Sequence, residues 1–224
     1  MLRRLATNTR GVALVEFAIC LPVLLLLYLG GCCLSDMLAC NRKVTTATRT
    51  LVDLVARTMS PTIVYNDPQS ANAKSYLSAS AVVLSPYKLD AATEQVSLPR
   101  VCDATHAYVV WTQAQTQNVD GSVVRATTPD QTAGTLPANQ AQAANTVIPI
   151  LTNMVTSTMV PTSPDGSNVC KNLAPGTATK TQVGTAGGWL YMGKISYSFT
   201  PSVSYLALGP VTLKHTIYMI PRLY

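Results

Sequence analysis

The first sixty residues divide into an apolar run and an amphipathic stretch. Residues 17–34 form eighteen consecutive positions without a charge, and residues 12–15 extend the apolar run upstream past Glu16. A run of that length spans a bilayer core as a helix. Between residues 35 and 59 apolar side chains recur mostly at intervals of three, four or seven, which predicts a continuing helix with one packing face. Ser60-Pro61 ends this helix, because proline disfavours helix in the residue before it.

The later part of the chain shows the period-two alternation of half-buried strands. Apolar residues alternate with polar ones at 194–200 and 211–219, and a third segment at 107–111 extends the predicted sheet. Pro201 and Gly209-Pro210 lie between the first two segments and connect them as an antiparallel pair. His215 falls on the apolar face of its strand, where we expect it to be half-buried. Residues 112–186 are predicted to be a polar surface insert that holds a short helix within residues 140–160.

Composition and charge narrow the class of protein. Charged residues make up 12% and apolar residues 48% of the chain, which fits one membrane helix joined to a polar domain. The net charge of +6 owes half to Arg3, Arg4 and Arg10 ahead of the apolar run, and no basic stripe interleaved with aromatics follows, so no nucleic-acid partner is expected. The same arginines predict a cytoplasmic N-terminus and an exported C-terminal part.

No grouping of residues predicts catalysis or metal binding. The two histidines, His106 and His215, are far apart, and the six cysteines lack the paired short spacing of a zinc site. There is no nucleophile and base pair, no paired carboxylates and no phosphate-binding glycine loop. We therefore expect a protein that is not an enzyme, with no cofactor, no metal and no small-molecule substrate.

Glu16 is the one carboxylate in the apolar run. At mid-membrane such a group costs roughly 2.5 to 3.5 kcal/mol on insertion scales, and less near the interface. It either snorkels toward the cytoplasmic headgroups or has a partner. The sequence Arg10-Gly11-Val12-Ala13-Leu14-Val15-Glu16-Phe17 resembles the prepilin processing site, in which a membrane peptidase cuts after the glycine. The cut would free an ammonium on Val12, one helical turn from Glu16, and in a stack of subunits that ammonium would meet a neighbour's Glu16.

Residues 10–57 resemble the TadE/TadG-like family, the minor pilins or pseudopilins of the tight-adherence (Flp) pilus. The resemblance rests on Arg10-Gly11, VEFA at 15–18, Leu21-Pro22, the leucine run, and the Thr/Ala/Arg-rich stretch that ends at Arg57. It implies a pilin-like α+β fold: a long N-terminal transmembrane helix, then a small antiparallel β-sheet domain with a long polar insert. Implied partners are a prepilin peptidase, other pilin subunits, the pilus assembly platform and the inner membrane.

On this basis residues 1–11 are a cleaved leader with Gly11 and Val12 at the scissile bond, and residues 12–34 are the membrane part of the helix. Residues 35–60 are its amphipathic continuation, and residues 61–224 are an exported domain. Glu16 and Phe17 set subunit register during assembly, and the protein supports pilus assembly or priming and surface adhesion. The location implied is the bacterial inner membrane, with possible incorporation into an extracellular pilus.

A second interpretation stays open. Leu29-Gly30-Gly31-Cys32 resembles a lipobox, which would make the chain a lipid-anchored or membrane-anchored binding protein independent of a pilus. Gly30 and Gly31 also depart from the family's pattern, because they permit a bend or a close helix approach.

The cysteines fall into two groups. Cys20, Cys32, Cys33 and Cys40 lie in or beside the apolar segment, where they act as small apolar residues. Cys102 and Cys170 stand apart in the part predicted to be exported, so a disulfide between them is expected. The alternative, two unrelated buried thiols, stays open because sequence spacing does not show that the side chains meet.

Overall fold

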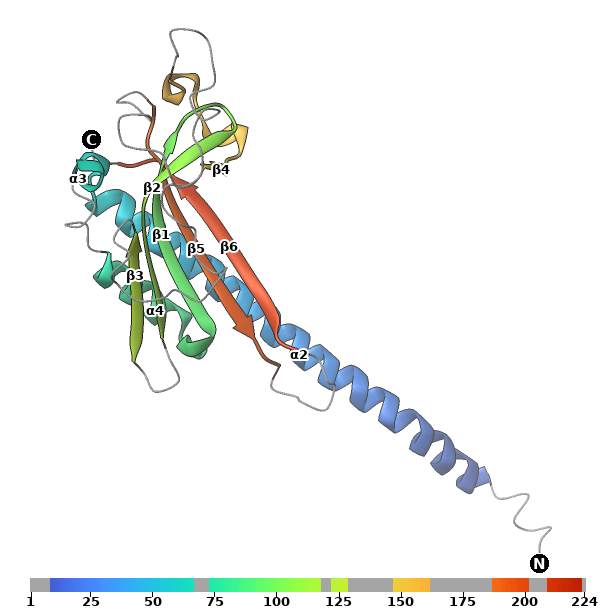
Figure 1. Cartoon of the computed structure of the whole chain (residues 1–224). Helices are drawn as coiled ribbons and strands as arrows, with labels where there is room; N and C mark the ends of the chain where they lie inside the picture. The colour runs from blue at the N-terminus through green and yellow to red at the C-terminus, as the bar shows by residue number, and fades with distance from the viewer. Residues whose placement is uncertain are drawn as a thin grey trace, which may run out of the picture.

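The computed structural model describes residues 9–66, 73–117, 122–128, 147–161, 187–201 and 209–222; of residues 9–13, 65–66, 117 and 124–128 only the backbone is described. Figure 1 shows one long helix, α2 (Thr9–Thr58), whose later half lies against a small β-sheet domain while its first half projects away. Fifty residues of helix are about 75 Å long at 1.5 Å per residue. The expected α+β class and long N-terminal helix are confirmed.

The sheet is antiparallel, with the strand order β3-β2-β1-β5-β6. The predicted pair at 194–200 and 211–219 is confirmed as β5 and β6, with Ile195 opposite His215. The third predicted strand belongs to β2, but β1 separates it from that pair. The elements of the domain are α3 (Pro61–Asn66), α4 (Lys74–Leu84), β1 (Ala92–Val101), β2 (His106–Gln117), β3 (Val123–Thr128), β4 (Val147–Pro149), β5 (Tyr191–Phe199) and β6 (Val211–Met219).

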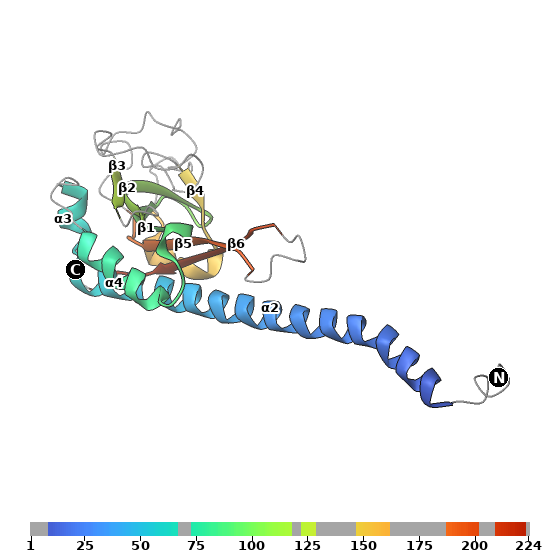
Figure 2. The ribbon, with the colours of Figure 1, turned by 90° about the horizontal axis from the view of Figure 1, so that it is seen from below.

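Helices α2 and α4 cover the same face of the sheet, as Figure 2 shows. The main core lies between them and the strands, where Leu51 and Val52 of α2 and Leu77 of α4 pack with Val96 and Leu98 of β1. Nearer the projecting part of α2, a second cluster joins Cys40, Val44 and Ala47 to Ile195, Tyr197 and Phe199. The helix is thus part of the core of the domain along its whole later half.

The central strand β1 carries a polar sequence, ATEQVSLPRV, yet all ten residues are buried. Its polar side chains find partners within the sheet: Gln95 Nε2 donates to Ser97 Oγ at 2.7 Å, and Ser97 and Thr112 share a hydroxyl hydrogen bond of 2.8 Å. Pro99 is accommodated by a shift in register between Leu98 and Pro99. Because both faces of β1 are buried, its sequence lacks the contrast between an apolar and a polar side, which is why alternation did not reveal it.

Two expectations for the insert are wrong. Residues 112–117 continue strand β2, and Val123–Thr128 pair with them as β3, so the sheet extends into the segment expected to be a surface insert. The expected helix within 140–160 is replaced by the short strand β4 and two 3-10 turns, Thr152–Met154 and Ser157–Met159. Pro149 and the β-branched Val147 and Ile148 disfavour helix, and the edge of β2 offers a strand partner. The rest of the insert lies outside the described residues.

Candidate assembly site on the N-terminal helix

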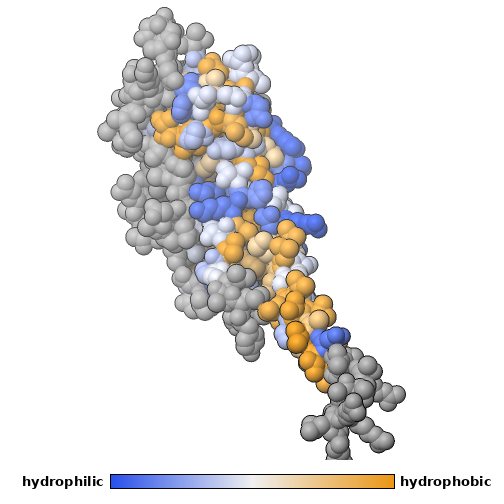
Figure 3. All heavy atoms as spheres, turned by 90° about the vertical axis from the view of Figure 1, so that its right-hand side faces the viewer, coloured by the Kyte–Doolittle hydropathy of each residue, from blue (hydrophilic) through white to orange (hydrophobic). Residues whose placement is uncertain are grey.

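The projecting part of α2 presents apolar side chains to the outside. Leu14, Phe17 and Leu27 are 71%, 61% and 69% exposed, and none of the most apolar window of the helix is buried within the chain. Figure 3 shows this apolar surface on the projecting stem. In the described part of the chain, α2 is the one helix long and apolar enough to cross a membrane, by length and composition. A surface of this kind requires a membrane or protein partner.

Gly11, Val12 and Glu16 lie on consecutive turns of α2. The helix begins at Thr9, so the predicted scissile bond between Gly11 and Val12 lies in its first turn, where only the backbone is described. Glu16 is exposed, as is Phe17. Four residues of helix rise about 6 Å, which places the backbone nitrogen of Val12 one turn below Glu16. After a cut at that bond, Val12 would start the helix, and its ammonium would lie one turn from the Glu16 carboxylate.

The later half of α2 is fixed to the sheet by close packing. Val44, Leu51 and Val55 are fully buried, and Gly193 of β5 gives Val52 its room, because a β-carbon there would overlap a Val52 methyl group. The hydroxyl of Tyr191 donates to the carbonyl of Met59 at 3.0 Å. The helix therefore joins its apolar stem rigidly to the domain.

The end of the chain is also fastened to α2. The Arg222 N–H donates to the carbonyl of Ala56 at 2.9 Å, and its guanidinium lies 3.3 Å from Asp53. Asp53 also pairs with Arg57 at 2.9 Å. Because these groups are partly exposed, the ion pairs add little stability, but they position the segment that follows β6 on the helix.

Basic residues occupy the exposed side of α2 above the apolar stem. Arg42, Lys43 and Arg49 are exposed and form no ion pair with a described residue. Threonines on this stretch satisfy their hydroxyls within the helix, as where Thr46 donates to the carbonyl of Arg42 at 2.9 Å. The helix thus changes from an apolar stem to a polar, basic surface at the level where the sheet begins.

The cysteines near the apolar run are free thiols. Cys20 and Cys32 are exposed, whereas Cys33 and Cys40 are buried. Burial raises the pKa of Cys40 to about 11, so its thiol stays protonated and unreactive. Gly30 and Gly31 make no close approach to other described residues, and the helix continues through them. Cys102 is buried and disulfide-bonded; Cys170 lies outside the described residues, so the pairing of the two remains a prediction.

The histidines and tryptophans have structural surroundings. His106 and Asp103 form a turn between β1 and β2, in which Asp103 accepts hydrogen bonds from the backbone N–H groups of Thr105 and His106 at 2.6 and 2.8 Å. His215 is half-buried, as predicted. Trp111 is fully buried, and the Arg100 guanidinium lies 4.2 Å from the ring centre of Trp189. Among the described residues, no three His, Cys, Asp or Glu side chains gather as metal ligands would.

Glu94 is an ionisable residue of the domain that was not predicted from the sequence as a candidate site residue. Glu94 of β1 is only 3% exposed, and neither carboxylate oxygen has a hydrogen-bond partner in the described part of the chain. The sequence held one signal for it: in Glu94, Val96 and Leu98 the acid occupies the first place of an alternating apolar series. The strand itself was not predicted, so the signal was not recognised.

Comparison with known proteins gives one match. A sequence model of the family described as TadE-like protein matches residues 11–52. No curated protein and no solved structure matches the chain. The matched segment contains the apolar stem and the first turns that pack on the sheet, and it ends before the sheet domain begins. The family resemblance seen in the sequence is therefore confirmed for the N-terminal helix. The family match does not cover the sheet domain.

Proposed function

We infer that this chain is a minor pilin or pseudopilin of a tight-adherence (Flp-type) pilus. The starting point is the match of residues 11–52 to the TadE-like family. The family match supports a role in that pilus system. The observation that carries the finer proposal is the position of Glu16, exposed in an apolar helical stem one turn after Gly11-Val12. The chain would help to assemble or prime the pilus and so support surface adhesion.

The proposed assembly step uses two charges. A prepilin peptidase would cut between Gly11 and Val12 and leave an ammonium at the start of α2. In a bilayer both this ammonium and the Glu16 carboxylate are costly when unpaired. Pairing Glu16 of one subunit with the Val12 ammonium of its neighbour removes both costs, and it does so only at one axial offset between subunits. Phe17, exposed beside Glu16, would pack against the neighbouring stem.

The proposed location follows from the charges that flank the stem. The arginines ahead of residue 11 favour a cytoplasmic N-terminus in the bacterial inner membrane, with the sheet domain on the far side. There it would meet other pilin subunits and the assembly platform. The exposed basic side of α2 lies at the level of the sheet and is available for contacts with those partners.

The lipid-anchored alternative fits the family match less well. Acylation at Cys32 requires removal of everything up to Gly31, which would delete residues 11–31, half of the segment that matches the TadE-like family. Cys32 is also in the interior of a continuous helix.

The proposal is tested by replacing Glu16 with valine in the full-length protein. Membrane insertion should be unchanged or improved, because a carboxylate leaves the apolar stem. Pilus number and co-purification with the other pilus subunits should fall. Cys20→Val is the matched control, because Cys20 is exposed one turn further along α2 and carries no charge; it should leave assembly intact. Normal assembly of the Glu16→Val protein would reduce Glu16 to a snorkelling residue and remove the main support for the proposal.

A further inference from the structure

Glu94 is a buried carboxyl group on the face of the sheet that α4 covers. Strand alternation places it on the same side as Val96 and Leu98, which pack in the core beneath α2 and α4. Its nearest hydroxyl on α4, that of Ser80, donates to the carbonyl of Leu77 at 2.8 Å. The Ser80 hydroxyl is close enough to Glu94 to lower its pKa slightly, but its hydrogen is already donated to Leu77, and in the described part of the chain neither carboxylate oxygen has a hydrogen bond of good geometry.

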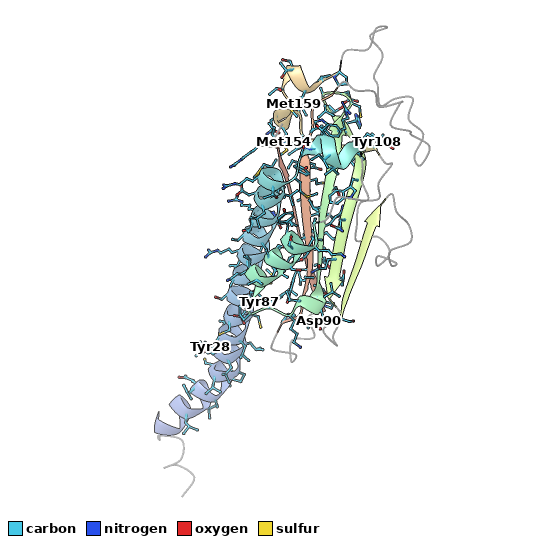
Figure 4. The ribbon with its side chains drawn as sticks, turned by 90° about the vertical axis from the view of Figure 1, so that its left-hand side faces the viewer. Tyr28, Tyr87, Asp90, Tyr108, Met154 and Met159 are labelled. Carbon is cyan, nitrogen blue, oxygen red and sulfur yellow. The ribbon has the colours of Figure 1, made fainter. Side chains whose placement is uncertain are left out.

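A small cavity and a larger groove lie next to this carboxyl group. The cavity has a volume of about 10 Å³, and its walls are Ala81, Leu89, Ala92, Glu94 and Gln115. The groove, of about 440 Å³, shares Ala81, Leu89 and Gln115 with the cavity and continues along α4 past Val82 to Pro86 and Tyr87. Figure 4 shows Tyr87 at the end of the domain nearest the projecting part of α2. The cavity beside Glu94 therefore adjoins a groove that opens to the surface.

The shape and lining of the groove define what it accepts. Its outer walls are largely apolar, and Val82 there is 73% exposed. Its inner end has room for about one water-sized group, beside a carboxyl group. A lysine side chain has both properties, because its four methylenes pack on apolar surface while its compact ammonium donates three hydrogen bonds. The planar guanidinium of arginine is larger and fits such a cavity poorly.

We propose that this groove receives a lysine side chain of a neighbouring subunit, whose ammonium pairs with the carboxylate of Glu94. The existence of the groove and its carboxyl group does not depend on the pilus assignment. Only the claim that the lysine belongs to another pilus subunit rests on the proposed function.

Proton exchange accompanies this pairing. Burial raises the pKa of Glu94 to about 8, an effect that the Ser80 hydroxyl offsets only in part. Near neutral pH the acid is therefore mostly protonated, and the incoming ammonium displaces its proton: R–NH₃⁺ plus Glu–COOH gives the ion pair plus H⁺. Among the described residues that line the cavity, Glu94 alone is titratable, and the residues opposite it are the neutral Gln115 of β2 and Ile195 of β5. The titratable residues of the elements beside the cavity are Lys74 of α4 and Tyr87, Lys88 and Asp90 of the segment after α4.

The test uses the full-length protein in detergent micelles and the peptide acetyl-Ala-Lys-Ala-amide, with binding followed by the NMR signals of the lysine methylenes. Affinity should increase about tenfold for each pH unit between pH 6 and 8 and level off above pH 8, because one proton is released. Glu94→Gln, which keeps the size of the side chain, should remove both the binding and its pH dependence. The matched control Asp90→Asn removes a carboxyl group outside the cavity and should leave both unchanged, as Asp90 lines neither the cavity nor the groove.

Two further ligands test whether the groove selects a lysine side chain. The arginine analogue of the peptide should bind more weakly than the lysine peptide. Cadaverine, a free diamine, tests whether an amine binds without a peptide backbone. Absence of saturable lysine-peptide binding at pH 8.5, or binding that survives Glu94→Gln while the variant keeps its native melting transition, would overturn the proposal. Glu94-dependent binding of cadaverine without binding of the peptide would also overturn it, in favour of a free amine. Since the probe is a free peptide, the outcome does not depend on whether the chain assembles into a pilus.

Discussion

Gly193 of β5 lies against Val52 of α2 so closely that a β-carbon at position 193 would overlap the Cγ2 methyl of Val52. Val52 is fully buried in the main core cluster. The helix that carries the apolar stem and the sheet that forms the domain therefore meet at backbone contact.

Gly193→Ala should destabilise the domain by about 1 to 3 kcal/mol, the usual effect of adding a methyl group to a filled core. The measurement is denaturant unfolding of the full-length protein in micelles. In the double variant Gly193→Ala with Val52→Ala, the removed methyl groups make room for the new β-carbon, so the two effects should not add. A fully additive double variant would show that the two positions do not share this contact.

The buried Glu94 predicts that the domain loses stability as pH rises. Its pKa is raised from an ordinary 4.5 to about 8 in the folded protein. Between these two values the folded state binds the proton that the unfolded state has lost, so the free energy of unfolding falls with pH, by at most about 1.4 kcal/mol per unit. The loss should begin near pH 5 and end near pH 8. Unfolding midpoints measured from pH 5 to 9 check this.

Glu94→Gln cannot ionise, so its stability should be flatter over the same pH range than that of the unmodified protein. Lys88→Gln changes an exposed charge beside the same segment and should preserve the slope. An identical pH slope in the wild-type and Glu94→Gln proteins would mean that Glu94 does not titrate in this range.

Cys102 should be joined to Cys170. The bridge closes a loop of 170 − 102 + 1 = 69 residues, for which the chain-entropy model gives about 4 kcal/mol in the absence of strain. Peptide mapping of exported protein under non-reducing conditions should yield one cross-linked peptide pair. Cys40, a buried free thiol, should be alkylated only after unfolding. Recovery of Cys102 and Cys170 as separate alkylated thiols would exclude the bridge.

Local patterns predicted α2 and the β5–β6 pair, because apolar and polar residues recur in each at the spacing of a helix or of a strand. In β6, for example, Ile217 and Met219 alternate with Thr216 and Tyr218. Strand β1 gives no such contrast. Thr93 and Gln95 are as buried as Val96, so both faces of this strand are covered, and its strand neighbours come from distant parts of the chain. Strand β4 depends likewise on the free edge of β2, which no local pattern reveals.

The same distinction applies to the candidate sites. Gly11, Val12 and Glu16 are neighbours on one helix, so their spacing alone places the Val12 nitrogen and the Glu16 carboxylate one turn apart. The groove beside Glu94 brings together residues from α4, from the segment that follows it, and from β1 and β2. The residues that line the groove extend in sequence from Ser78 to Val123 of β3, and only the fold shows that they form one site.

Processing at the predicted bond is the step on which the pilin assignment depends. Gly11→Leu should leave the leader attached, because the peptidase requires a small residue ahead of the scissile bond, and the protein should still insert into membranes. Gly11→Ala keeps a small residue there and should still be processed. Equal processing of the leucine variant would contradict this requirement.

The most direct test is the N-terminal mass of the protein extracted from membranes of cells with and without a prepilin peptidase. The pilin assignment predicts a mature chain that begins at Val12 when the peptidase is present, and an intact leader when it is absent. A chain that begins at an acylated Cys32, or an intact leader in both kinds of cell, would contradict it.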